Sequence, residues 1–258
     1  MKDLPFRYTR TIVIRARPAT VFRYFTDSGR FASWWGAGST IDRRPGGRVH
    51  IVYPGGTTAG GEVLSLEADR RIVFTYGYDQ KLPKSPGDTL VLIERGGSRV
   101  TISLAPHGEG TSLTIVHEVA EERVREEHAA GWRFQLSLFA NVVAREEHTG
   151  LATRVDTLFA AWGEPDPGKR AGLLAEATTD DVGFRDPYAT IVGRDELNDH
   201  LTALQKHMPG TRLVRDGEPR QCQGVALVRW TAGKASGTNV VRLAPDRRIA
   251  DLVGFWNG

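Results

Sequence analysis

The chain has 258 residues, of which 40% are hydrophobic and 25% charged, a composition typical of a globular protein with two domains. Its 34 Lys and Arg residues nearly balance 31 Asp and Glu residues and form no dense run, which excludes a nucleic-acid binder. No window reaches the about 18 uncharged apolar residues of a membrane span. Because Cys222 is the single cysteine, no intrachain disulfide can form, and we expect a cytoplasmic protein.

The first half predicts a strand, two short helices, about six strands and one long helix, in that order. Apolar residues alternate over residues 6–14, Pro18 suits a first helical turn, and Trp34-Trp35-Gly36 ends a second helix. The strand-like runs between Gly- and Pro-rich turns are residues 48–53, 61–67, 71–78, 88–94, 99–104 and 111–118. Residues 121–147 lack proline and carry an apolar stripe at helical spacing. A long helix across a curved antiparallel sheet leaves space for a ligand.

The pattern restarts after His148, which predicts a domain of residues 1–148 and a second of residues 149–258. Helices are expected at residues 151–162, 169–177 and 195–207, and strands at 182–185, 212–215, 224–231, 237–243 and 248–256. Helices followed by long strands predict an α+β cone whose mouth the helices close.

Short motifs of the first half occur in the order that one known superfamily shows. They are Thr26-Asp27, Trp34-Trp35-Gly36, Gly46-Gly47, the runs 71–76 and 110–114, and Gly131-Trp132. The sequence from residue 6 to about 145 thereby resembles the START-like, or SRPBCC, superfamily, and within it the activator of heat-shock-protein-90 ATPase homologue group. This resemblance implies a helix-grip fold around a hydrophobic cavity. It does not imply chaperone activity, because a fold does not fix a function.

Motifs of the second half resemble the SnoaL-like group of the nuclear transport factor 2-like superfamily. They are the runs 182–187, 193–197, 208–210 and 248–256. The resemblance implies a cone-shaped α+β barrel, a fold that hosts isomerases, cyclases and binding modules. We also expect this half to form a homodimer.

Aromatic and titratable side chains of the first half alternate with apolar residues on the expected strands and helix. Those expected to line the cavity are Trp34, Trp35, His50, Glu62, Tyr76, Tyr78, His117, His128 and Trp132. The alternative is that these stripes are plain hydrophobic core, as most such stripes are.

Two residues of the second half match the ketosteroid-isomerase branch of that superfamily. The branch carries its catalytic base in a strand followed by an Asp-Pro turn, where this chain has Asp186. It carries an oxyanion donor on the next-to-last strand, where this chain has Asn239. The branch's tyrosine donor on the first helix has no counterpart, because Leu158 falls near its position. The alternative for Asp186 is a purely structural role as the cap of the turn before Pro187.

Further candidates of the second half each have a structural alternative. Asp251 alternates with apolar residues on the last strand, so it faces inward and is either functional or paired with an Arg such as Arg229 or Arg242. His200 is a second acid–base candidate or a core histidine. Tyr188 and Trp230 are expected as cavity walls, and the Trp230 indole is a possible hydrogen-bond donor.

The sequence contains no metal-ligand spacing, phosphate loop or dinucleotide fingerprint, so we expect neither a metal nor a cofactor. The expected function is binding of apolar small molecules in two cavities, with isomerase- or cyclase-type proton transfer in the second domain. The alternative is a non-enzymatic ligand-binding or co-chaperone-like stress-response protein.

Overall fold

The computed structural model describes residues 3–79 and 93–257. The protein is α+β, as predicted, and its antiparallel sheets are open. The chain divides into two compact units, Met1–Val143 (unit 1) and Ala144–Gly258 (unit 2). No helix among the described residues is both long and apolar enough to cross a bilayer.

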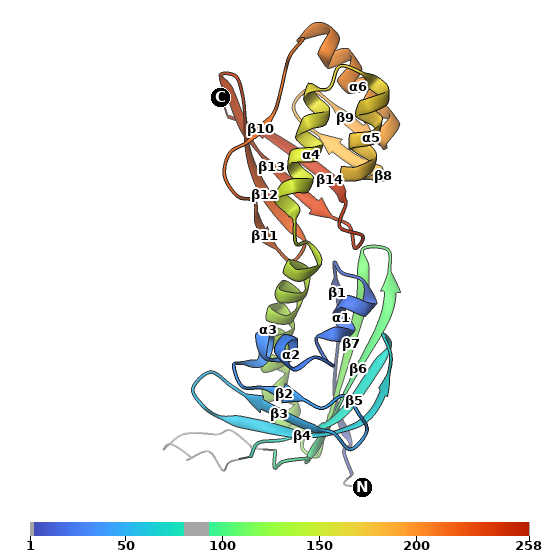
Figure 1. Cartoon of the computed structure of the whole chain (residues 1–258). Helices are drawn as coiled ribbons and strands as arrows, with labels where there is room; N and C mark the ends of the chain where they lie inside the picture. The colour runs from blue at the N-terminus through green and yellow to red at the C-terminus, as the bar shows by residue number, and fades with distance from the viewer. Residues whose placement is uncertain (1–2, 80–92, 258) are drawn as a thin grey trace. The chain divides into compact units, whose positions relative to one another are not determined.

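Unit 1 contains an antiparallel sheet in the strand order β1-β7-β6-β5-β4-β3-β2 (Figure 1). Its strands are β1 (Phe6–Ile14), β2 (Thr40–Ile41), β3 (Arg48–Val52), β4 (Thr58–Glu67), β5 (Arg71–Tyr76), β6 (Ser98–His107) and β7 (Gly110–Val119). Burial alternates along β1, so the predicted face of this strand is confirmed. The strand predicted at residues 88–94 lies largely outside the described residues.

Three helices cover one face of this sheet: α1 (Pro18–Arg23), α2 (Ser28–Trp35) and α3 (Glu122–Glu147). Proline starts α1, and the Asp27 side chain accepts the Arg30 N–H at the start of α2. The apolar stripe of α3 is buried at Trp132, Leu136 and Phe139, as its helical spacing predicts.

Unit 2 contains a second, mostly antiparallel sheet in the order β10-β12-β13-β14-β8-β9, with β11 paired to β12. Its strands are β8 (Thr178–Arg185), β9 (Thr190–Val192), β10 (Val214–Arg215), β11 (Arg220–Cys222), β12 (Val225–Ala232), β13 (Ala235–Leu243) and β14 (Ile249–Trp256). The central strands β12, β13 and β14 pair in sequence order and supply the inner surface that the cavity uses.

The helices of unit 2 are α4 (Leu151–Gly163), α5 (Pro167–Ala177) and α6 (Arg194–His207). A fully buried guanidinium, that of Arg170, joins them. Its Nε donates to Asn198 Oδ1 at 2.7 Å, and its Nη1 donates to the Glu164 carbonyl oxygen at 2.8 Å. Because a buried cation is tolerated only with hydrogen-bond partners, these contacts fix α5 against α6 and the end of α4.

Strand β14 contains a bulge near its start. Ile249 pairs with Leu243, but Asp251 pairs with Arg242, so Ala250 is an extra residue between two consecutive pairs. Ile249 and Leu252 are both buried as a result, although their spacing is odd. After the bulge, Leu252 and Gly254 face the interior, whereas simple alternation from Ile249 would place Asp251 and Val253 there.

Candidate functional sites

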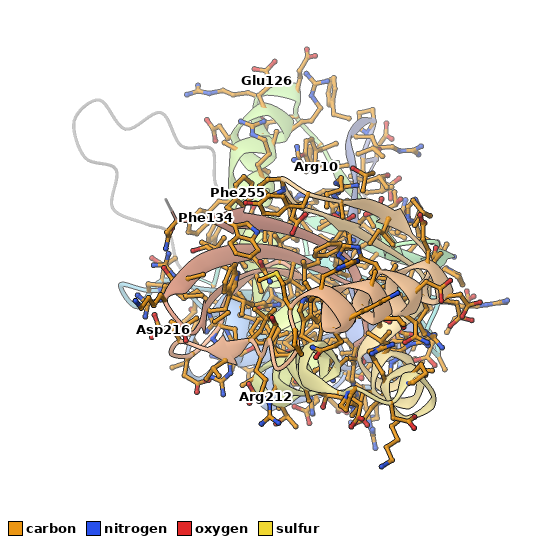
Figure 2. All side chains as sticks on the ribbon, turned by 90° about the horizontal axis from the view of Figure 1, so that it is seen from above. Arg10, Glu126, Phe134, Arg212, Asp216 and Phe255 are labelled. Atoms are coloured by element: carbon orange, nitrogen blue, oxygen red, sulfur yellow. The ribbon has the colours of Figure 1, made fainter. Side chains whose placement is uncertain are left out.

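Unit 1 contains a partly open cavity of about 560 Å³ between its sheet and its helices. The wall is mostly aromatic, and its rings are Trp34, Trp35, Tyr53, Tyr76, Tyr78, His128, Trp132 and Phe134. Phe134, labelled in Figure 2, is 64% exposed. The predicted residues Trp34, Trp35, Tyr76, Tyr78 and Trp132 therefore do meet around one space.

A directional chain of hydrogen bonds lies directly behind this wall. The Trp132 indole N–H donates to His117 Nδ1 at 3.0 Å, so the ring proton of neutral His117 is on Nε2. Nε2 then donates to Ser98 Oγ at 2.8 Å, and Ser98 Oγ donates to the Tyr76 carbonyl oxygen at 2.9 Å. His117 is thus a structural link from α3 to β6 and β5, one step behind the cavity surface.

Burial keeps two histidines and two tyrosines around this cavity uncharged. It lowers the pKa of His117 to about 3, with a further contribution from neighbouring His128, and it lowers the pKa of His128 to about 4. Burial likewise raises the pKa of Tyr53 and Tyr76 above the ordinary value, and their hydroxyl oxygens lie 2.7 Å apart in a hydrogen bond. These groups are polar but uncharged, and the one carboxylate among the described lining residues, that of Glu127, pairs with Arg123 on the same helix.

Trp132→Phe is expected to lower the free energy of unfolding of unit 1 by about 1–3 kcal/mol, because it leaves buried His117 Nδ1 without its donor. Trp35→Phe is the matched control: Trp35 is buried to the same extent, but its indole Nε1 has no hydrogen bond in the described residues. Urea unfolding of both variants measures the difference. An equal loss in the two variants would show that the hydrogen bond to His117 contributes nothing.

Three residues predicted for this cavity do not line it: His117, which lies behind the wall, His50 and Glu62. His50 is on the opposite face of β3 from buried Val49 and Ile51, and its Nδ1 is 3.8 Å from Asp79 Oδ2. Glu62 is exposed, because β4 buries Val63 and its pairing with β5 shifts between Val63 and Ser65. The prediction that His50 and Glu62 face the cavity is therefore wrong.

Unit 2 contains a partly open cavity of about 340 Å³. Its wall includes the predicted residues Asp186, Tyr188, His200, Trp230 and Asn239. These come from the turn after β8, from α6 and from the inner face of β12 and β13. Residues far apart in sequence thus converge on one small space.

Asp186 caps the turn after β8 and lines the cavity at the same time. Its Oδ1 accepts the backbone N–H groups of Tyr188 and Ala189, both at 2.8 Å. The capping role proposed from sequence is therefore present. It occupies one carboxylate oxygen and leaves Oδ2 without a hydrogen bond within the described chain, so capping and a chemical role are compatible.

Asn239 is buried and is oriented by Trp230. The Trp230 indole N–H donates to Asn239 Oδ1 at 2.9 Å. Because an indole N–H can only donate, this contact identifies the amide oxygen and fixes the direction of the NH₂ group. The structure gives Asn239 Nδ2 no hydrogen bond among the described residues, so this donor remains for a ligand.

Gly254 brings Asp186 and Asn239 to the same space. It pairs with Asn239 across β13 and β14. A Cβ atom on residue 254 would lie 3.3 Å from Asn239 Oδ1 and 3.4 Å from Asp186 Cβ. The missing side chain therefore leaves room between the Asn239 amide oxygen and the Asp186 Cβ atom, and all three residues line the same cavity. Sequence reasoning did not single out this glycine.

His200 lines the same cavity and packs against Phe184, with ring centroids 6.0 Å apart. Tyr188 is 77% exposed at the rim, where its ring meets Trp256 edge-on. Tyr188 therefore lies where the sequence predicts a cavity wall, and His200, predicted as an acid–base candidate or a core histidine, lines the same cavity.

Asp251 does not belong to this group, because the bulge at Ala250 turns its side chain away from the cavity. Both Asp251 carboxylate oxygens accept from Arg185 Nη2 at 2.8 Å, rather than from Arg229 or Arg242. The prediction that Asp251 faces inward is therefore wrong.

The family model described as Activator of Hsp90 ATPase homolog 1-like protein matches residues 15–144, half of the chain. The protein belongs to this family. A comparison with curated proteins gave no match.

Solved structures similar to parts of the chain include both groups named from the sequence. One is described as a candidate isomerase of the SnoaL-like family from Agrobacterium tumefaciens, at 28% identity and TM-score 0.40, covering 44% of this chain and 99% of that protein. Another is an AHSA1-like protein from Rhizobium etli, at 26% identity and TM-score 0.43, covering 55% and 85%. A third, from Chromobacterium violaceum, has 26% identity and TM-score 0.41, covering 53% and 95%.

Proposed function

We propose that this protein encloses uncharged apolar small molecules in its two cavities and that unit 2 transfers a proton next to a carbonyl group. The observation that supports the proton transfer most strongly is that Asp186 and Asn239 line one cavity and flank Gly254 there. A carboxylate with one free oxygen and an oriented amide donor are the base and the oxyanion partner that enolisation requires.

We also propose a particular fold for each domain. Residues 1–148 form a helix-grip domain, in which the long α3 closes an antiparallel sheet. Residues 149–258 form a cone of the nuclear transport factor 2-like type, with helices α4, α5 and α6 before its main strands. Homodimer formation through the second domain and a cytoplasmic location stay predictions.

The proposed reaction starts with a ketone in the unit 2 cavity, its carbonyl oxygen at Asn239 Nδ2. Asp186 Oδ2 forms a bond to a proton on the adjacent carbon. The electron pair of that C–H bond moves into a carbon–carbon double bond, and the carbonyl oxygen becomes an enolate. Asn239 donates a hydrogen bond to this oxygen, and Asp186 returns the proton to the original carbon or to a conjugated one.

Two neighbouring residues support this geometry. Trp230 holds the Asn239 amide with its NH₂ group free. The donor is therefore already oriented towards the developing enolate oxygen, whereas water molecules would have to reorient during the reaction. The two backbone N–H groups on Asp186 Oδ1 hold the carboxylate in place. Because Asn239 donates as a neutral amide, its role does not depend on protonation.

The experiment measures exchange of α-protons for deuterium by NMR in deuterium oxide, with β-tetralone as the probe. This bicyclic ketone suits a cavity of about 340 Å³. Wild-type protein is expected to accelerate exchange above the buffer rate. Binding of the ketone without acceleration would overturn the proton-transfer proposal and leave unit 2 as a binding domain.

A further inference from the structure

His128 is a polar group on the wall of the unit 1 cavity with free hydrogen-bonding capacity. It is partly buried, and neither ring nitrogen has a hydrogen bond among the described residues. We propose that unit 1 recognises an uncharged aromatic compound carrying one carbonyl or hydroxyl group, and that this group hydrogen-bonds to His128. The inference rests on the proposed function, because it requires unit 1 to bind a small molecule.

Most neighbouring polar groups of the wall are already engaged within the protein; the exception among the described residues is the Trp35 indole N–H, which can donate to a ligand but cannot accept. The Trp132 indole N–H is used by His117, and both nitrogens of His117 are used by Trp132 and Ser98. The hydroxyl groups of Tyr53 and Tyr76 bond each other. His128 therefore offers a ligand a polar contact that does not require an internal hydrogen bond to break.

Three rings hold the His128 imidazole in position. Its centroid lies 5.0 Å from that of His117, 5.8 Å from Tyr76 and 6.3 Å from Tyr78, in edge-on or tilted contacts. These rings come from β7, from β5 and from the segment directly after β5, whereas His128 is on α3. An imidazole fixed from the sheet side of the cavity is preorganised for a directional hydrogen bond.

The electrostatics of the cavity determine the charge of the ligand. The same burial that keeps both histidines neutral and both buried tyrosines protonated penalises a charged ligand. The Glu127 carboxylate on the wall, which already pairs with Arg123, adds repulsion against an anion. A neutral imidazole has one N–H donor and one nitrogen acceptor, so it can serve a carbonyl or a hydroxyl group. The aromatic wall favours a flat ring through offset or edge-on contacts.

The test compares three probes that share one ring system: acetylnaphthalene, ethylnaphthalene and naphthoate. Binding is followed through the NMR signals of the Trp35 and Trp132 indole N–H groups, each assigned with its Phe variant. Because both indoles line the unit 1 cavity, these signals distinguish its occupancy from binding in unit 2. Wild-type protein is expected to bind acetylnaphthalene most tightly and naphthoate most weakly.

His128→Phe keeps a ring in place and removes both nitrogens. It is expected to weaken acetylnaphthalene binding about 2- to 12-fold, the equivalent of one neutral hydrogen bond of about 0.5–1.5 kcal/mol, and to change ethylnaphthalene binding less than about twofold. Phe134→Leu is the control, because it alters an exposed side chain of the same wall without a polar atom. It is expected to leave the ratio of the two affinities unchanged.

The possible failures are distinguishable. If no naphthalene shifts the indole signals, the proposed ligand binding in unit 1 is wrong. If acetyl- and ethylnaphthalene bind but His128→Phe affects both equally, or neither, binding stands and the role of His128 is wrong. Naphthoate binding as tight as that of the ketone would overturn the requirement for an uncharged ligand.

Discussion

Asp186→Asn is expected to lower the rate of α-proton exchange by about 10²- to 10⁴-fold, the contribution typical of a positioned general base. The substitution keeps the shape of the side chain, and the asparagine oxygen can still accept the N–H groups of Tyr188 and Ala189. Ketone affinity is therefore expected to change less than about twofold. The measurement is exchange of β-tetralone protons by NMR, together with a separate titration of its binding.

Asp251→Asn is the matched control for this experiment. It removes the same charge, but from a carboxylate that pairs with Arg185 away from the cavity. We expect its exchange rate to stay within about twofold of wild type, because Asp251 does not line the cavity and an Asn there keeps the shape of the side chain. If Asp186→Asn exchanges as fast as the wild type, or if the two variants lose activity equally, Asp186 is not the base.

Unit 1 is expected to lose about 4 kcal/mol of stability as the pH falls from about 7 to about 5, about 2 kcal/mol from each of His117 and His128. In the folded protein their pKa values are lowered to about 3 and about 4, from an ordinary value of 6.5. Below pH 6.5 the unfolded chain therefore binds protons that the folded unit does not. The stabilisation is present above the unfolded pKa and is lost progressively as the pH falls towards the folded values.

Urea unfolding of the full chain across this pH range, followed by hydrogen exchange at the amides of β6 and β7, measures the loss in unit 1. His128→Phe is expected to halve the pH dependence. Substitution of exposed His107 by Gln, which affects a residue of the same unit outside the cavity, is expected to leave it unchanged. A pH dependence that persists in full in His128→Phe would contradict the assignment.

A helix or strand could be predicted where its hydrophobic period repeats several times along the sequence. Long elements such as β1 and α3 repeat theirs over several turns or pairs, and their predicted bounds agree with the structure to within one residue. The strands β2, β9 and β11 were not predicted, because two or three residues cannot show a period.

The candidate sites were predictable where one local signal fixed a side chain. The strand and Asp-Pro turn indicated the position of Asp186, and the aromatic stripe indicated Trp132. The roles of Gly254 and Ser98 depend on partners in neighbouring strands, so only pairing reveals them. Predictions from alternation were wrong at Glu62 and Asp251. Glu62 precedes a shift in strand pairing and Asp251 follows one, and the period of the sequence does not record such shifts.

The bulge at Ala250 also identifies the one position near the start of β14 at which a change in chain length is tolerated. Side chains of a strand alternate between faces, so removal of one residue from a regular stretch exchanges the two faces on one side of the deletion. Ala250 is the exception, because without it the pairs Ile249–Leu243 and Asp251–Arg242 become consecutive, and Leu252 and Gly254 keep their places opposite Val241 and Asn239. A deletion further along β14, at Val253, would instead move a neighbouring residue into the place of Gly254 and close the gap beside Asn239. Relatives that differ in length at Ala250 are therefore expected to keep the chemistry of this cavity, whereas those that differ in length at Val253 are not.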